Sequence, residues 1–185
     1  MVQIQLVSPD IKYAAALSKQ SSDPNVRDTL GLTKLQSSVQ GTVDFIHFVL
    51  EAERQGNQYS RIILNEIEEP VGVITLKEIN EKEGTSEIGT WLGVKHWGKG
   101  YNELAKTEIL YHAFEKLNLV RVFAGAKKTN IRSLKSQEKL PYIKIDVGAN
   151  FPEQHTKMES DARQPCILNV IERDCFLEWY KNNMI

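Results

Sequence analysis

The stretch from Ser86 to Leu119 constrains the fold of this chain most strongly, because a strand-like run leads there into a glycine turn and a long helix. The residues before the turn that favour a strand are Ile88, Trp91, Leu92 and Val94. After the turn, one face of a helix is apolar at Leu110, Ala113, Phe114 and Leu117. The pattern predicts a strand followed by a helix that packs on the sheet through its apolar face.

The turn itself has the composition of an anion-binding loop and consists of Lys95, His96, Trp97, Gly98, Lys99 and Gly100. The two glycines lack a Cβ, so the backbone can bend tightly and aim its N–H groups at an anion where the helix begins. Lys95 and Lys99 add positive charge, with His96 as a further candidate. Two familiar phosphate loops do not fit, because Glu103 replaces the third dinucleotide-loop glycine and no Gly-Lys-Ser/Thr triplet follows. A glycine turn that only starts a helix is the alternative.

Composition excludes several classes of protein. A length of 185 residues suffices for one domain with a full core, which we expect to span residues 1–185. Because 23 Lys and Arg balance 24 Asp and Glu, no overall charge favours nucleic acid as a partner. No apolar run approaches the roughly 20 residues that span a bilayer, and the first residues lack the basic segment of a signal peptide. We expect a cytoplasmic protein without a membrane partner.

The cysteines and histidines indicate neither a disulfide nor a metal site. Cys166 and Cys175 form no CxxC pair, and we expect both to be inert packing residues. The four histidines, at positions 47, 96, 112 and 155, show no spacing of four residues and no carboxylate at ligand spacing.

Periodicity and turn residues predict the remaining elements. Strands are expected at 2–7, 59–65, 70–79, 87–94, 121–126, 142–151 and 166–172. Helices are expected from Asp10 to Leu17, from Thr42 or Asp44 to about Gly56, and over 130–140 and 173–185. Residues 18–41 are expected to form loop with short helical turns, and residues 152–165 a polar loop. The strand at 121 follows a helix, so it requires a parallel crossover and the sheet is mixed.

A second motif makes a family resemblance specific. Asn130-Ile131-Arg132-Ser133, followed by Glu138-Lys139-Leu140, resembles the N-x-x-S-x-x-x-x-E-K-L segment of the GCN5-related N-acetyltransferases. The glycine turn resembles the Q/R-x-x-G-x-G/A loop of the same family, with Lys95 in the Gln/Arg place. The spelling resembles that of the branch that includes the ribosomal-protein N-terminal acetyltransferases. The order of elements fits over about residues 1–180.

The resemblance implies an α/β fold in which a central mixed, mostly antiparallel sheet is splayed between two parallel strands and flanked by helices. Acetyl-CoA would enter that split as the cosubstrate, its pantetheine pairing with backbone of Thr90–Val94, and no metal is implied. The residues implied to bind it are Leu92, Gly93, Val94, Lys95, His96, Trp97, Gly98, Lys99, Gly100, Tyr101, Asn130 and Ser133. Asn130 is equally suited to cap the following helix.

Catalytic residues are expected from the chemistry of an amine that attacks a thioester. Only a neutral amine is a nucleophile, so a base is useful, and Glu87 is the first candidate with Glu153 second. The oxyanion needs a preorganised N–H, for which Gly93 or Val94 is suited. Many relatives carry a tyrosine acid where this chain has Gln137, which leaves Ser133 as the implied thiol partner and Tyr142 and Tyr111 as weaker candidates. Pro141-Tyr142 also replaces the usual Gly-Phe.

The resemblance therefore implies an N-acetyltransferase that transfers an acetyl group from acetyl-CoA to a primary amine by direct attack. The acceptor is a peptide or protein α-amine, or a small-molecule amine. A polycation is suggested by the acids Glu66, Glu68, Glu69, Glu78, Glu81 and Glu83, although solvation explains these acids too. The alternative function is a CoA-binding or partner-binding module without catalysis. A monomer or a homodimer is expected, the latter through an edge strand such as the last one.

Overall fold

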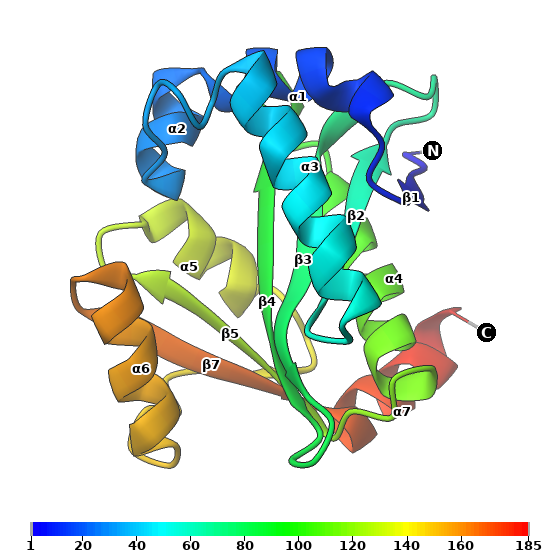
Figure 1. The fold of residues 1–185 in the computed structure, drawn as a ribbon. Coiled ribbons are helices and arrows are strands. Elements are labelled where there is room, and N and C mark those ends of the chain that lie inside the picture. Colours follow the sequence, from blue (N-terminus) through cyan, green and yellow to red (C-terminus); the bar gives the residue numbers. More distant parts are fainter. Residues whose placement is uncertain (1, 185) are drawn as a thin grey trace. The chain divides into compact units, whose positions relative to one another are not determined.

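The computed structural model describes residues 2–184, whose strands follow the order β1-β2-β3-β4-β5-β7-β6 (Figure 1). The strands are β1 (Gln5–Val7), β2 (Gln58–Leu64), β3 (Pro70–Asn80), β4 (Thr85–Leu92), β5 (Arg121–Lys127), β6 (Ile143–Lys144) and β7 (Cys166–Glu172). The helices are η1 (Ile11–Tyr13), α1 (Ala14–Ser21), α2 (Pro24–Leu30), α3 (Val39–Arg54), η2 (Val94–His96), α4 (Tyr101–Glu115), α5 (Ile131–Glu138), α6 (Pro152–Ala162) and α7 (Arg173–Met184).

The described residues form two compact units. The first extends to Ile79 and also includes Gly89–Ile109, and the second comprises Asn80–Ile88 and the residues from Leu110 onward. In the first unit β1, β2 and β3 are antiparallel neighbours, and α3 packs along β2 (Figure 1). The alternation of these strands directs Ile62, Leu64 and Val73 toward α1, where they form a buried core with Leu17.

The second unit contains the predicted parallel pair. Thr85–Ile88 of β4 pair with Arg121–Ala124 of β5 in parallel register, and β5 in turn pairs antiparallel with β7. Helix α6 lies against β5 and β7 (Figure 1). The core of this unit includes the buried side chains of Phe123, Val147, Leu168 and Val170. The prediction of a mixed, mostly antiparallel sheet flanked by helices is therefore confirmed.

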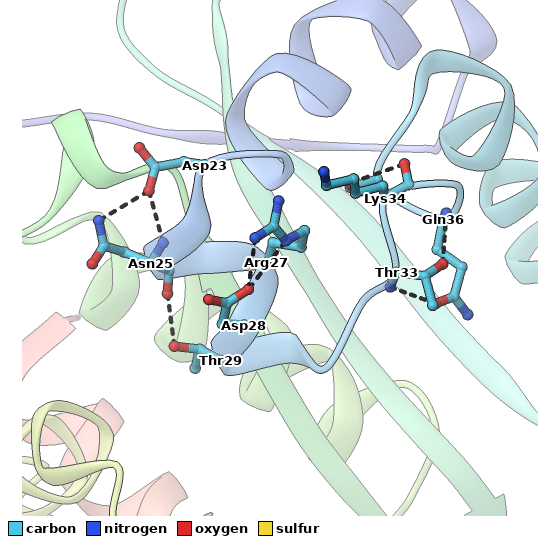
Figure 2. A network of polar contacts seen from close by, with 9 residues as sticks. Asp23, Asn25, Arg27, Asp28, Thr29, Thr33, Lys34 and Gln36 are labelled. Atoms are coloured by element: carbon cyan, nitrogen blue, oxygen red, sulfur yellow. Dashed lines mark hydrogen bonds and ion pairs between the residues drawn. The ribbon is translucent and has the colours of Figure 1, made fainter.

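The segment 18–41 is more helical than expected. Helix α1 continues to Ser21, and α2 occupies a stretch predicted to be mainly loop. Asp23 caps α2 by accepting the backbone N–H of Asn25 (Figure 2). Gly31 ends the helix in the left-handed conformation with φ of 69°. Further polar contacts hold the connection to α3, including the reciprocal bonds between Thr33 and Gln36 (Figure 2). Local capping, rather than an apolar face, orders this segment, and apolar periodicity does not detect it.

Three predictions for the second unit are wrong. Residues 152–165 contain α6 rather than only a polar loop, and the strand expected over 142–151 shrinks to β6. Helix α6 presents few apolar side chains, of which Met158 packs on the core, so its periodicity is weak. The last strand is also not an edge, because β7 lies between β5 and β6. Because β6 pairs with Val170 and Ile171, pairing between copies at these residues would require that β6 be displaced.

The other predicted elements are confirmed with shifted ends. Helix α3 begins at Val39 because the Ser38 hydroxyl accepts the N–H of Gly41. Asp10 caps the short helix η1 through the N–H of Lys12, so regular α-helix starts only at Ala14. Within residues 2–184, no helix is long and apolar enough to cross a membrane.

Candidate functional site

Hydrogen bonds hold the first half of the loop between β4 and α4 in place. The Gly93 N–H donates to the Val71 carbonyl across 2.9 Å, and the Trp97 N–H donates to the Val94 carbonyl across 3.1 Å. The Trp97 indole N–H also donates to the Leu92 carbonyl at 2.9 Å. These bonds fix where the chain leaves the sheet. They also engage the Gly93 N–H, so of the two amides predicted to stabilise an oxyanion only Val94 is suited to the role.

The second half of the loop is open. Gly98 and Gly100 have φ of 72° and 88°, values that L side chains rarely adopt. A Cβ built on either glycine would meet no atom within 4 Å, and Lys95 and Lys99 beside them are exposed. The loop thus combines a bent backbone, empty space and positive charge at the beginning of a helix. These features fit the pyrophosphate of a nucleotide cosubstrate.

Tyr101 and His96 frame this loop, and His96 does not carry the positive charge for which it was a candidate. Tyr101, the first residue of α4, donates a hydrogen bond from its hydroxyl to Glu66 at 3.1 Å. His96 is buried with an exposed fraction of 4%, and its ring meets that of Tyr101 edge to face. Burial, and then the charges of Lys95 and Lys99, lower the pKa of His96. The histidine is therefore neutral at physiological pH and does not add positive charge to the loop.

The second unit holds the Asn130 motif at the start of α5. The Asn130 side chain accepts the backbone N–H of Ser133 at 3.2 Å and so caps the helix, as the sequence allowed. Ser133 lies in the first turn of α5 and is partly exposed. Capping fixes the position of the Ser133 backbone and leaves its hydroxyl accessible.

Gln137, which stands in the place of the family's tyrosine acid, is buried and forms a polar network. Its side-chain nitrogen donates to the Ser133 hydroxyl oxygen at 3.2 Å and to the Gly125 carbonyl at 3.3 Å. Its side-chain oxygen accepts from Asn169 at 2.7 Å. Sequence reasoning missed Asn169, because this residue lies on β7, 32 positions away from Gln137 on α5, and carries no local signal.

Glu87, the predicted base, lies on β4 and is buried. The side-chain amide of Gln154 on α6 donates a hydrogen bond to its carboxylate. Glu153, the second candidate base, is exposed in the first turn of α6. Gln154 was not predicted, because α6 was expected to be a loop.

The two weaker acid candidates belong to an aromatic cluster. The Tyr142 ring packs against Phe176 and Trp179 with centroids 4.9 and 4.7 Å apart. Tyr111 stacks on Tyr180 at 4.6 Å. These contacts assign both tyrosines a packing role between secondary-structure elements of the second unit. Among residues 2–184 there is no group of three His, Cys, Asp or Glu side chains arranged to hold a metal ion.

The fold belongs to the class of acyl-CoA N-acyltransferase folds. It has a mixed sheet with one parallel pair, and its strand β4 leads through a glycine loop into α4. The comparisons identify the family within that class. A model described as "Acetyltransferase (GNAT) domain" matches residues 3–142, and the chain belongs to this family. It is therefore an acetyl-CoA-dependent acetyltransferase that acts on amines.

Individual relatives agree with this assignment. The chain is similar to the "Uncharacterized N-acetyltransferase p20" of Bacillus licheniformis, with 31% identity over 144 residues that cover 77% of this chain and 80% of that protein. It also resembles the structure of a putative ribosomal-protein-serine acetyltransferase from Vibrio cholerae, with a TM-score of 0.60, 20% identity and coverage of 72% and 75%. Spermidine N-acetyltransferase from Vibrio cholerae, in complex with CoA and spermine, matches with a TM-score of 0.72, 12% identity and coverage of 95% and 98%. At these identities the structural matches show the shared fold.

Proposed function

We propose that this protein transfers the acetyl group of acetyl-CoA directly to the α-amine of a peptide or protein. The observation that carries the proposal is the open loop at Gly98 and Gly100, flanked by Lys95 and Lys99. In this proposal the loop from Lys95 to Tyr101 holds the pyrophosphate through the amides of its open second half, and the backbone of Thr90–Val94 holds the pantetheine. Asn130 and Ser133 contact the thiol end.

The chemical step requires three functions from the protein. As the amine nitrogen bonds to the acetyl carbon, Glu87 accepts the proton that the amine loses. The Val94 N–H donates to the oxyanion that develops on the carbonyl oxygen. As the carbon–sulfur bond breaks, the Ser133 hydroxyl donates a hydrogen bond to the sulfur, which leaves as CoA thiolate. No covalent bond to the enzyme forms at any step.

The protonation of the acceptor favours an α-amine. An α-amine has a reference pKa of about 7.7 to 8.0 and is partly neutral near neutral pH, whereas an alkylamine such as lysine lies near about 10.4. A larger fraction of an α-amine is therefore ready to attack the thioester. The hydrogen bond from Gln154 holds the Glu87 carboxylate in place for the proton that this amine then loses.

The acidic residues that suggested a polycation are dispersed in the structure. Glu66, Glu68 and Glu69 lie at the turn between β2 and β3 in the first unit, and Glu66 already accepts the Tyr101 hydroxyl. Glu81 and Glu83 lie at the turn between β3 and β4 in the second unit, and both are exposed. Glu78 lies on β3, and all six acids are exposed, which favours solvation over a binding site for a polyamine.

An acceptor competition tests the proposal. Purified protein is given acetyl-CoA with a peptide that begins with serine, the same peptide with a blocked N-terminus, or spermidine, and thiol release and product mass are recorded. We expect acetylation of the free peptide, at its α-amine only, and roughly 100-fold slower turnover in Glu87→Gln. Glu153→Gln, on the exposed neighbouring carboxylate, is the matched control and retains activity.

Other outcomes would change the account in defined ways. Turnover of spermidine without turnover of the peptide would contradict the α-amine acceptor. Binding of acetyl-CoA without turnover of either amine would favour the alternative function, a CoA-binding module. Unchanged turnover in Glu87→Gln would remove Glu87 from the catalytic step.

A further inference from the structure

Gln137 replaces the tyrosine that many members of this family place near the thiol, and its contacts suggest a different use for the position. The side chain is buried with an exposed fraction of 3%, and Asn169 beside it has 2%. An amide cannot supply the proton that a tyrosine can. Asn169 donates to Gln137, and Gln137 donates to the hydroxyl oxygen of the partly exposed Ser133. Such a chain of hydrogen bonds is able to orient the Ser133 hydroxyl.

The orientation of both side-chain amides follows from neighbouring backbone groups that can act only as a donor or only as an acceptor. The backbone N–H of Asp146 can only donate, and it meets the side-chain oxygen of Asn169 at 2.8 Å. The nitrogen of Asn169 therefore faces Gln137 and donates to its oxygen. This directs the nitrogen of Gln137 toward the Ser133 hydroxyl. The Gly125 carbonyl, which can only accept, meets the same nitrogen and independently requires the same orientation.

The consequence concerns the proton of Ser133. Because the Ser133 oxygen accepts an N–H from Gln137, its own O–H is directed away from the network. Within the described residues the structure records no acceptor for that O–H, and the side chain is partly exposed. The hydroxyl is thereby arranged as a donor toward a ligand. A hydroxyl that receives a hydrogen bond is also a stronger donor.

We infer that Gln137 and Asn169 are positioning residues that keep the Ser133 hydroxyl turned toward the CoA sulfur as a hydrogen-bond donor. The inference rests on the proposed contact between Ser133 and the thiol end. In the transfer step, the carbon–sulfur bond breaks, the electron pair stays on sulfur, and the Ser133 O–H stabilises the thiolate. The amine supplies the proton that leaves, so Ser133 keeps its own and the step is balanced.

The thiol pKa of bound CoA reports this donor without any acceptor amine. It is measured by the ultraviolet absorbance of the thiolate during a pH titration of CoA bound to the protein. In the wild type we expect a thiol pKa below that of free CoA, because the donor stabilises the thiolate. Ser133→Ala and Gln137→Glu should each raise it by about one unit, equivalent to the loss of one charge-assisted hydrogen bond. Glu138→Gln, an exposed change on the same helix, should leave it unchanged.

A double variant separates positioning from a direct effect of the new charge. If Gln137 acts through the hydroxyl, Gln137→Glu has no further effect on the thiol pKa in the Ser133→Ala background. A shift that persists in that background is a direct charge effect and would overturn the inference. Asn169→Asp provides a second route, because it should turn the Gln137 amide around and reproduce the Gln137→Glu shift without touching Ser133.

Failure of the inference is distinguishable from failure of the proposed function. If Ser133→Ala raises the thiol pKa but Gln137→Glu and Asn169→Asp change only thermal stability, the two amides are structural and the inference is wrong. If Ser133→Ala itself leaves the thiol pKa unchanged while CoA still binds, the assignment of Ser133 in the proposed function is wrong, and the inference with it.

Discussion

The Tyr101 hydroxyl donates a hydrogen bond to the Glu66 carboxylate at 3.1 Å, which joins the first residue of α4 to the turn between β2 and β3. The backbone N–H of Glu66 itself, and then this bond, lower the pKa of Glu66. Burial, and then the same bond, raise the pKa of Tyr101. Because Tyr101 directly follows Gly100, the bond anchors the end of the glycine loop.

Replacing Tyr101 by Phe should weaken acetyl-CoA binding several-fold and lower the melting temperature. A group with a lowered pKa in the folded state stabilises the fold above its unfolded pKa of about 4.5, and this contribution is lost as pH falls through the folded value. The variant should therefore lose less stability than the wild type on acidification. Thermal melts at about pH 7 and about pH 3 measure this difference. Tyr13→Phe, on a ring that packs against the core of the same unit, is the control.

The buried His96 predicts a second dependence on pH. Its pKa is lowered from 6.5, so between the folded value and 6.5 the unfolded chain binds a proton that the folded protein does not. Stability should thus decline as pH falls below about 6.5. His96→Phe removes this decline, whereas His47→Phe, on the exposed side of α3, retains it. The free energy of unfolding is measured by denaturant titration at several pH values. An equal change of this free energy with pH in the wild type and in His96→Phe would contradict a neutral, buried histidine.

Lys106 is a buried lysine on α4 whose pKa is lowered to about 8 by burial. Stability linked to it is fully present above the unfolded value of 10.5 and is lost as pH falls through about 8. Lys106→Met removes this cost and should stabilise the protein at pH 7 by up to about 3 kcal/mol. The gain should shrink toward pH 10. Chemical denaturation at both pH values measures it, with the exposed Lys19→Met as control. A gain independent of pH would assign the effect to packing alone.

The expectation that both cysteines are inert packing residues is wrong for Cys175, which is exposed, so the two cysteines should react at very different rates. Cys166 is buried, and burial raises its thiol pKa, whereas Cys175 is exposed on α7. In the native protein a thiol reagent should label Cys175 rapidly and Cys166 only after unfolding. Mass spectrometry of labelled peptides measures both rates, and Cys175→Ser should abolish the rapid phase. Rapid labelling of Cys166 would show that the beginning of β7 becomes accessible in the native state.

The sequence predicted those parts of the molecule whose signals are local. The apolar run before Gly98, and the period of the helix after Gly100, placed β4 and α4 correctly. Helix α6 was missed because it is held by contacts with residues far along the chain, such as that of Met158 with Gly125 of β5 and that of Gln154 with Glu87. Tertiary contact, not an amphipathic repeat, holds that helix in place.

The same distinction applies to the candidate site. The glycine loop and the cap at Asn130 depend on residues close in sequence, so both were predictable. The partner of Glu87 is Gln154, 67 positions away, and the partner of Gln137 is Asn169. Sheet pairing and helix packing create these contacts, and no spacing along the chain indicates them.

Acetyl-CoA binding by a glycine-loop variant tests the central claim most directly. Calorimetry compares the wild type with Gly100→Trp, which fills the open space at the loop, and with Gly31→Trp. Gly31 is a matched control because it also has a positive φ and open space but ends α2. We predict binding by the wild type and Gly31→Trp and its loss in Gly100→Trp. Wild-type affinity in a folded Gly100→Trp variant would contradict the assignment of this loop as the acetyl-CoA site.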